Sequence, residues 1–229
     1  MKKRKIISLA VDEMKRRKNS HRFRNASRKL RKSLNTFHIG DSKIYTGYPP
    51  GCPKHSNNPY AFKPFVINKA REDGYDQVLW IDAACIVKKR LDPIWNILDK
   101  QGYYIQLNGW QSGEWASDDC LRQMNVTRDE AMLMPHAMAN VMGFDFTNPI
   151  AEKLFNTWHN HGKMGTFNGD WKNDKQQCSQ DPRCLGFRHD QTVISILASQ
   201  AGLNFTDCSA NKLLSYKQSD GYVIHAAGA

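Results

Sequence analysis

The sequence lacks any apolar run near the roughly 18 consecutive residues that a membrane-spanning helix requires. The apolar stretch that follows the first basic residues is also too short for a secretory signal peptide. From these two absences we expect no membrane span and a cytoplasmic protein. The six cysteines include no Cys-x-x-Cys pair, which argues against the common structural zinc motifs and for free thiols. Cys178 and Cys184, which lie near His189 in the sequence, leave a zinc site open as an alternative.

Acidic residues are scarce relative to basic ones. Lys and Arg number 33 against 22 Asp and Glu, which gives a formal net charge of +11. Fourteen of the basic residues but only two acids lie between Lys2 and Lys32. A positive surface attracts phosphate-rich partners through counterion release, so nucleic acid or an anionic nucleotide is favoured as a partner. The alternative is an ordinary solvated helix face.

The stretch Gln77–Val87 is mostly apolar and carries one acid, Asp82. Its pattern predicts a buried parallel strand that ends near this carboxylate. An ionised acid within an apolar run loses hydration and requires a cation, a donor network or a ligand. Ligands in open α/β sheets bind outside the carboxyl ends of strands, so we expect Asp82 at the mouth of a cleft. Alternatively, Asp82 caps the turn that leaves the strand.

The order of elements predicts an α/β protein with a mostly parallel central sheet flanked by helices. Because 229 residues suffice for one sizeable core and not for two, we predict a single domain over residues 1–229. We expect strands at 5–11, 43–46, 77–87, 103–107, 139–146 and 222–228. We also expect a basic amphipathic helix at about 20–37, a helix at about 127–134, and helices that begin at Pro64, Pro93, Pro149 and near Asp190.

Two loops are unusual. The segment 108–115 is rich in glycine and tryptophan, and its indoles at Trp110 and Trp115 either stack on a flat partner such as a sugar or base, or fill the core below the loop. A long polar loop is predicted at about 159–187. Loops of that length in a compact domain are usually functional lids or mobile segments.

Three candidate ligand residues, Asp82, Asp190 and His225, fall at predicted strand ends or helix starts that face one edge of the sheet. Carboxylate and imidazole groups together can hold magnesium or manganese and leave positions open for a diphosphate. The alternatives are a helix cap for Asp190 and a hydrogen-bonded strand end for His225.

Four short motifs follow one another along the chain: Leu79-Trp80-Ile81-Asp82-Ala83, Asp92-Pro93-Ile94-Trp95, Arg188-His189-Asp190-Gln191 and His225-Ala226-Ala227-Gly228. This order resembles nucleotide-sugar glycosyltransferases of the GT-A fold. The resemblance covers roughly Tyr60 to Gly228 and implies a single GT-A-like, Rossmann-like domain.

The resemblance also implies roles for the residues that match. Asp82 corresponds to the first acid of an Asp-x-Asp motif, which contacts the ribose or the metal, and His225 to the histidine that completes the coordination of Mn or Mg. Ala84 stands where the second carboxylate would be, which departs from the family pattern. The remaining residues expected at the donor are Ala83, Gly109, Trp110, Gln191 and Gly228.

Asp190 is expected near the acceptor hydroxyl and the transferred sugar. A carboxylate at a helix N-terminus can act as a general base, although the neighbouring Arg188 and His189 and the helix dipole lower its pKa. Arg188 is the candidate for neutralising the leaving diphosphate.

The basic N-terminal region is similar in kind to small phage-encoded transferases that add sugars to hydroxymethylated pyrimidines in DNA. This resemblance predicts a DNA acceptor, and the host cytoplasm as the location if the protein is virus-encoded. Two alternatives stay open. One is a cytoplasmic glycosyltransferase that acts on a polysaccharide, a lipid-linked glycan or a protein, and the other is a non-enzymatic nucleic-acid-binding protein.

Overall fold

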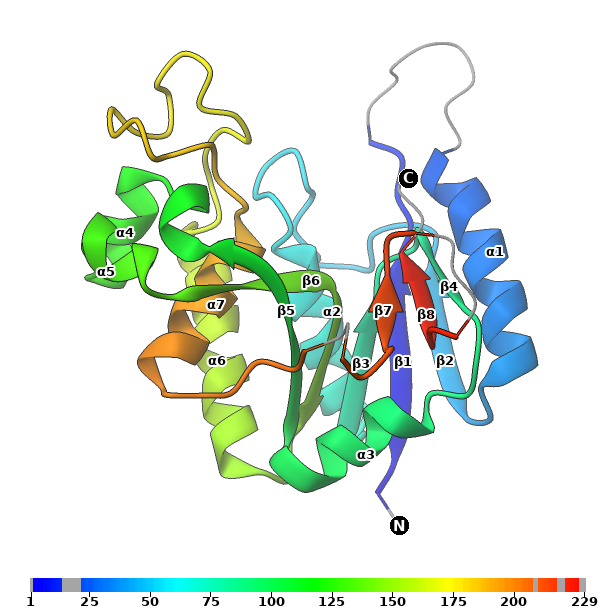
Figure 1. Ribbon diagram of the computed structural model, residues 1–229. Helices are drawn as coiled ribbons and strands as arrows, with labels where there is room; N and C mark the ends of the chain where they lie inside the picture. The colour runs from blue at the N-terminus through cyan, green and yellow to red at the C-terminus, as the bar shows by residue number, and fades with distance from the viewer. Residues whose placement is uncertain (1, 14–21, 208–209, 218–220, 227–229) are drawn as a thin grey trace.

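A computed structural model describes residues 2–13, 22–207, 210–217 and 221–226 of the chain. Its centre is a five-stranded sheet in the order β2-β1-β3-β6-β5, with helices on both faces (Figure 1). The strands are β1 (Arg4–Leu9), β2 (Asp41–Tyr45), β3 (Gln77–Ile81), β5 (Tyr103–Gln111) and β6 (Pro135–Asp145).

The sheet is mostly parallel, as predicted. β1 pairs in parallel with β2 and with β3, whereas β6 pairs antiparallel with both β3 and β5. β6 is therefore the one described strand of this sheet that runs against the others. The sequence did not predict its reversed direction, because an apolar run looks the same whichever way its neighbours point.

Alternate side chains of the central strands enter two separate hydrophobic cores. Ile7, Val78 and Trp80 join the core that also contains apolar residues of α2 (Phe62–Glu72), α6 (Pro149–Met164) and α7 (Asp190–Gln200). Ile6, Leu79 and Ile81 join the core on the other face, which α1 (Arg22–Phe37) and α3 (Asp92–Gln101) cover.

A small second sheet adds to this other face. It consists of β4 (Cys85–Val87), β8 (Ile224–Ala226) and β7 (Leu214–Ser215) in the order β4-β8-β7. The predicted strand at 77–87 is therefore two strands, since the chain turns after Ile81 and enters the second sheet at Cys85. Asp82 lies in that turn, directly after the carboxyl end of β3.

The basic helix is present as α1, and its buried side is narrow. Leu30 and Leu34 pack into the core, while Phe23 remains substantially exposed. The predicted start at about residue 20 lies outside the described residues. None of the described helices has the length and apolarity needed to cross a bilayer.

Several predicted boundaries were wrong. α2 begins at Phe62, so Pro64 lies in its first turn, where the missing N–H costs no helical hydrogen bond. β5 continues to Gln111, which places Trp110 on a strand instead of a loop. α6 continues to Met164, so the polar loop predicted at 159–187 begins only after that residue. Short helices also occur at Ser112–Trp115 (η1), Asp118–Met124 (α4) and Arg128–Met132 (α5).

Gly102 ends α3 in the left-handed conformation, with a φ of 87°. A Cβ atom at this position would overlap the side chain of Asn148, which accepts the backbone N–H of Ile150 and so caps α6. We expect Gly102→Ala to lower the free energy of unfolding by about 2 kcal/mol, from strain and disturbance of the cap. Urea unfolding measures this loss. Gly47→Ala is the control, because no atom lies within 4 Å of its added Cβ, and equal losses in both variants would contradict the explanation.

Candidate active site

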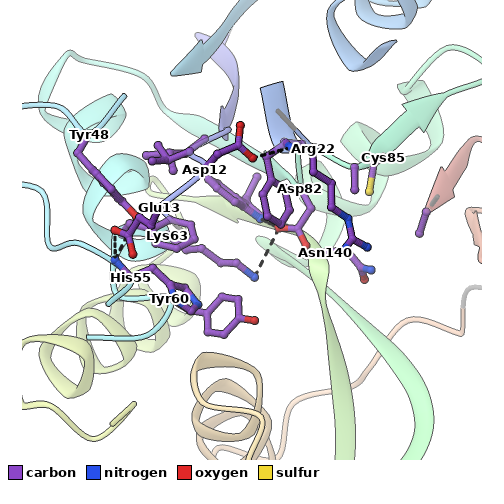
Figure 2. A pocket seen from close by; sticks show the side chains of 18 of the residues that line it. Asp12, Glu13, Arg22, Tyr48, His55, Tyr60, Lys63, Asp82, Cys85 and Asn140 are labelled. Carbon is purple, nitrogen blue, oxygen red and sulfur yellow. Dashed lines mark hydrogen bonds and ion pairs between the residues drawn. The ribbon is translucent and has the colours of Figure 1, made fainter. Parts of the chain in front are cut away.

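A cavity of about 640 Å³ opens at the carboxyl ends of β1 and β3 (Figure 2). Trp80, Asp82 and Asn140 line it from the sheet, and Tyr60 and Lys63 line it from the start of α2. The wall is completed by residues from the ends of β1, α1, β4 and β8 and from loops: Leu9, Val11, Asp12, Glu13, Arg22, Phe23, Tyr48, His55, Phe62, Ala83, Ala84, Cys85, Tyr216 and Ala226. The cleft predicted at the end of the Asp82 strand is thus present.

Asp82 faces this cavity with 35% of its side chain exposed. Its Oδ1 atom accepts a hydrogen bond of 2.7 Å from the indole N–H of Trp80. Its backbone N–H donates to the carbonyl oxygen of Asn140 at 2.7 Å. The carboxylate is therefore held at the end of β3 and still reachable from the cavity. The alternative of a simple turn cap does not account for its contacts with Trp80 and a buried lysine.

That lysine is Lys63, whose side chain is only 4% exposed. Its Nζ lies 3.1 Å from Asp190 Oδ2 and 3.5 Å from Asp82 Oδ1, and it donates to the carbonyl oxygen of Ala139 at 3.0 Å. Figure 2 shows the ammonium pointing toward Asp82 from α2. Lys63, Asp82 and Asp190, which we call the ion trio, therefore form one cluster from three separate segments, with Lys63 and Asp190 buried and Asp82 partly exposed.

In the ion trio, burial and the neighbouring opposite charges shift the pKa values in opposite directions. Burial lowers the pKa of Lys63, but the carboxylates of Asp190 and Asp82 raise it more, so the net shift is upward. Burial raises the pKa of Asp190 to about 6, against the opposing effect of Lys63. Burial likewise raises the pKa of Asp82, opposed by Lys63 and by the hydrogen bond from Trp80. Burial therefore favours the neutral form of each carboxyl group, and the Lys63 ammonium favours the charged form.

Asp190 is buried behind Lys63, with 3% of its side chain exposed. It does not line the cavity. The residue before it, His189, has a φ of 48°, and Tyr60 has a φ of 61°. The two rings lie 5.5 Å apart beside Lys63. Positive φ values at bulky residues carry strain, and such strain concentrates at functional sites.

The outer wall of the cavity carries further polar groups. Asp12 accepts the backbone N–H groups of Phe23 and Arg24 and so joins the end of β1 to the start of α1. Glu13 accepts the backbone N–H groups of His55 and Ser56. Burial lowers the pKa of His55.

The donor set for the metal that the resemblance implies is incomplete. Ala84 lines the cavity but offers no ligand atom. His225 pairs with Ile86, whereas its neighbour Ala226 pairs with Cys85 at the cavity wall. Because side chains alternate along a strand, His225 lies on the opposite face of β8, where its Nδ1 contacts the carbonyl oxygen of Ser215 at 3.2 Å.

Within the described residues, no group of three His, Cys, Asp or Glu side chains has the geometry to hold a metal ion. The cation beside Asp82 is the Lys63 ammonium. The residues present therefore do not fit the implied metal site. The metal stays a prediction, and no step below depends on it.

The other predicted site residues are divided between two places. Ala83 lines the cavity beside Asp82. Gln191 donates to the carbonyl oxygen of Ala137 at 2.6 Å, which ties α7 to β6. Gly109 and Trp110 lie near the end of β5 and do not line the cavity. Gly228 lies outside the described residues.

Arg188 does not line the cavity and lies among tryptophans. Its Cζ atom is 3.8 Å from the ring centroid of Trp171 and 4.0 Å from that of Trp115. Its backbone N–H donates to the carbonyl oxygen of Trp115. This position joins Arg188 to the tryptophan segments and not to the cavity wall.

Sequence reasoning missed Lys63, although the sequence contains a clue. Lys63, Val66, Ile67 and Ala70 follow the i, i+3, i+4, i+7 spacing of one helix face, and all four are buried. A lysine on the apolar, buried face of a helix requires an anionic partner from a neighbouring element. The partner could not be identified, because Asp190 lies more than a hundred residues later in the chain.

Comparisons with known proteins bear on the fold. No protein-family profile and no curated protein sequence matches the chain. Among solved structures, the chain is similar to a glycosyltransferase involved in the glycosylation of the major capsid of PBCV-1, at 11% identity and a TM-score of 0.53, over 99% of this chain and 95% of the other. Mouse xyloside xylosyltransferase 1 is similar at 10% identity and a TM-score of 0.52, over 98% and 97%.

A third similar structure is the bifunctional glycosyltransferase WbbM, at 12% identity and a TM-score of 0.55. The match covers the whole of this chain but 46% of WbbM. At such identities the likeness concerns the fold alone. The chain has a GT-A-like α/β fold, as predicted from its motifs.

The ion trio makes Lys63 a test of the site's electrostatics. Lys63→Met leaves two carboxylates without their cation, and we expect it to lower the free energy of unfolding by about 3–5 kcal/mol at pH 8. The loss of the ammonium raises the carboxylate pKa values further above their unfolded values. The loss of unfolding free energy in Lys63→Met therefore grows as pH rises from the carboxyl pKa values of the unfolded chain toward the raised values of the folded protein. It shrinks as pH falls.

Urea unfolding of wild type and variant at pH 5 and pH 8 measures this difference. Lys69→Met is the matched control on the same helix, because Lys69 is exposed and its pair with Asp73 spans 4.0 Å. A deficit in Lys63→Met that is small, or equal at both pH values, would show that the trio does not depend on the ammonium.

Proposed function

We propose that this protein is a glycosyltransferase that moves a sugar from a nucleotide-diphosphate donor to an acceptor hydroxyl. The observation that carries the proposal is the ion trio beside the cavity, in a chain with a GT-A-like fold. Burying Lys63 and Asp190 costs free energy, and the partly exposed Asp82 is left free to meet a ligand in the cavity. A non-enzymatic nucleic-acid-binding protein has no use for such a cluster next to a cavity.

The charge of the ion trio suits glycosyl transfer. Cleavage of the bond between sugar and diphosphate gives an oxocarbenium-like transition state, with positive charge on the sugar. With both carboxylates ionised the trio has a net charge of −1, and Asp82 exposes part of its carboxylate to the cavity. A fixed negative group aimed at developing positive charge lowers the barrier. Lys63 and Asp190 act as positioning residues that hold Asp82 ionised and in place.

The cavity also suits the donor. Its volume of about 640 Å³ lies within the usual range for small-molecule sites. Phe23, Tyr48 and Phe62 supply aromatic surface for a base, and Arg22 reaches the cavity from α1 with a charge for the diphosphate (Figure 2). Arg22 is better placed for that task than Arg188, whose predicted contact with the diphosphate stays a prediction.

The catalytic base and the acceptor remain predictions. Asp190 as general base requires a hydroxyl to reach a carboxylate that is almost fully buried, and its contact with Lys63 supports a positioning role instead. A hydroxymethylated pyrimidine in DNA as acceptor rests on the basic residues of α1.

Donor binding is the first test. We expect nucleoside diphosphates to raise the melting temperature by occupying the cavity, with one base preferred among UDP, GDP and CDP. The measurement is a thermal shift in manganese and again in EDTA, which also tests the metal prediction. A panel of UDP-, GDP- and CMP-linked sugars that gives no shift and no hydrolysis would remove the main support for the enzyme.

The acids of the trio give a second test. Asp82→Asn and Asp190→Asn each leave Lys63 with one carboxylate, so we expect both variants to fold. Donor turnover should fall by about 10²-fold or more in each, because the negative charge or its positioning is lost. Asp73→Asn is an exposed control and should keep wild-type turnover.

The pH dependence of turnover follows from Asp190. Its pKa of about 6 predicts a wild-type rate that falls as pH drops below about 6, because the protonated carboxyl no longer holds Lys63. The residual turnover rate of Asp190→Asn should not show this fall at low pH. A wild-type rate that is flat between pH 5 and pH 8 would contradict the assigned role.

A further inference from the structure

Three tryptophans and one arginine form a stacked group outside the cavity. The Arg188 Cζ atom lies 3.8, 4.0 and 5.7 Å from the ring centroids of Trp171, Trp115 and Trp110, respectively. The rings of Trp110 and Trp115 are 4.8 Å apart. We call these four residues the tryptophan platform. Cation–π stacking of this kind fixes the guanidinium between the indoles.

The tryptophan platform is open to solvent. Trp110 is 40% exposed and Trp171 is 45% exposed, whereas Trp80, Trp95 and Trp158 are buried. Large exposed aromatic side chains grouped together mark binding surfaces. Arg188 has no carboxylate partner within the part of the chain that the structure describes. Its Nη1 atom and the Nε1 atom of Trp115 are buried without a hydrogen-bond acceptor.

The backbone holds the platform in place. Lys172 and Gly186 form an isolated β-bridge, and a Cβ atom on Gly186 would overlap the carbonyl oxygen of Trp171. Only glycine permits this close approach. The carbonyl oxygens of Trp171 and Trp115 accept the backbone N–H groups of Phe187 and Arg188. The exposed indoles are thus preorganised, which reduces the entropy lost on binding.

Tyr60 connects the platform to the candidate active site. Its ring lines the cavity and lies 6.4 Å from the ring of Trp171. The Lys63 Nζ lies 5.1 Å from the Tyr60 ring centroid. A molecule bound on the platform would therefore have one end next to the ion trio, where the donor sugar is proposed to react.

The charge around the platform argues against a nucleic-acid acceptor. The segment Ser112–Met132, which begins next to Trp110 and contains Trp115, has five acids and two arginines, a net charge of −3. The segment Asp170–Arg188, which carries Trp171 and Arg188, has three acids and four basic residues, a net charge of +1. The basic helix α1 packs near β2 and β4, whereas Trp110 lies on β5 at the opposite edge of the sheet (Figure 1). The platform therefore lacks the excess of positive charge that binds a chain of phosphates, whereas an uncharged sugar needs none.

From these observations we infer that the acceptor is a sugar residue of an uncharged glycan, bound on Trp110, Trp171 and Arg188 with one hydroxyl directed toward the ion trio. The apolar face of a pyranose ring packs on an indole, and its hydroxyls accept hydrogen bonds from the Arg188 guanidinium. This inference rests on the proposed function and specifies its acceptor.

The test uses the full chain with a nucleotide sugar that the wild type hydrolyses. Acceptors are the methyl pyranosides of glucose, galactose, mannose and xylose, and in parallel duplex DNA that contains hydroxymethylcytosine. We expect transfer to at least one pyranoside. Trp110→Ala and Trp171→Ala should each lower that transfer by roughly ten-fold or more through a raised acceptor KM. Donor KM and donor hydrolysis should stay close to wild type.

Leu185→Ala is the matched control, since Leu185 is exposed on the same loop as Trp171, and it should behave as wild type. Trp171→Phe should restore part of the lost transfer, which a purely structural defect would not allow. Equal transfer by wild type and both alanine variants, or transfer to DNA alone, would overturn the inference and leave the proposed function standing. Absence of donor hydrolysis in the wild type would instead refute the proposed function itself.

Discussion

One lysine ammonium shared by two carboxylates is the interaction on which the site depends. The Lys63 ammonium donates a hydrogen bond to a backbone carbonyl and lies within ion-pair distance of Asp82 and Asp190. Removing two charges from water is favourable only when geometry and hydrogen bonding are nearly complete. This requirement fixes how α2, β3 and α7 are placed relative to one another, and it leaves the exposed part of Asp82 as the group that meets a ligand.

The fold explains why these three elements converge. β3 ends at the carboxyl edge of the parallel strands, and α2 and α7 pack in the same core against one face of the sheet. A cavity at that edge is what an open α/β sheet provides. The second sheet, β4-β8-β7, closes another side of the cavity. Because side chains alternate along β8, Ala226 lines the cavity and His225 points to the opposite face. The same fold thus supplies the cleft and removes one of the implied metal ligands from it.

The sequence predicted the features that depend on local pattern and not those that depend on distant pairing. The apolar run before Asp82 was sufficient to predict β3 and the cleft, and the four motifs led to the GT-A-like fold. The direction of β6, the two-sheet division after Ile81 and the partner of Lys63 all arise from contacts between distant segments. The stacking of Arg188 on Trp171 could not be predicted either, because it accompanies the close backbone approach between Gly186 and Trp171.

The ion trio also bears on how the protein reaches its native state. Lys63 and Asp82 are close in sequence, but the second carboxylate enters from α7, near the end of the chain. While Asp190 is undocked, the ammonium and Asp82 are expected to retain water, since a hydrated charge costs less than one buried with half its partners. Water around Lys63 and Asp82 is therefore expelled only when α7 packs against the sheet. During synthesis on the ribosome, the amino-terminal half should persist as a loosely packed, wet intermediate until this late helix emerges.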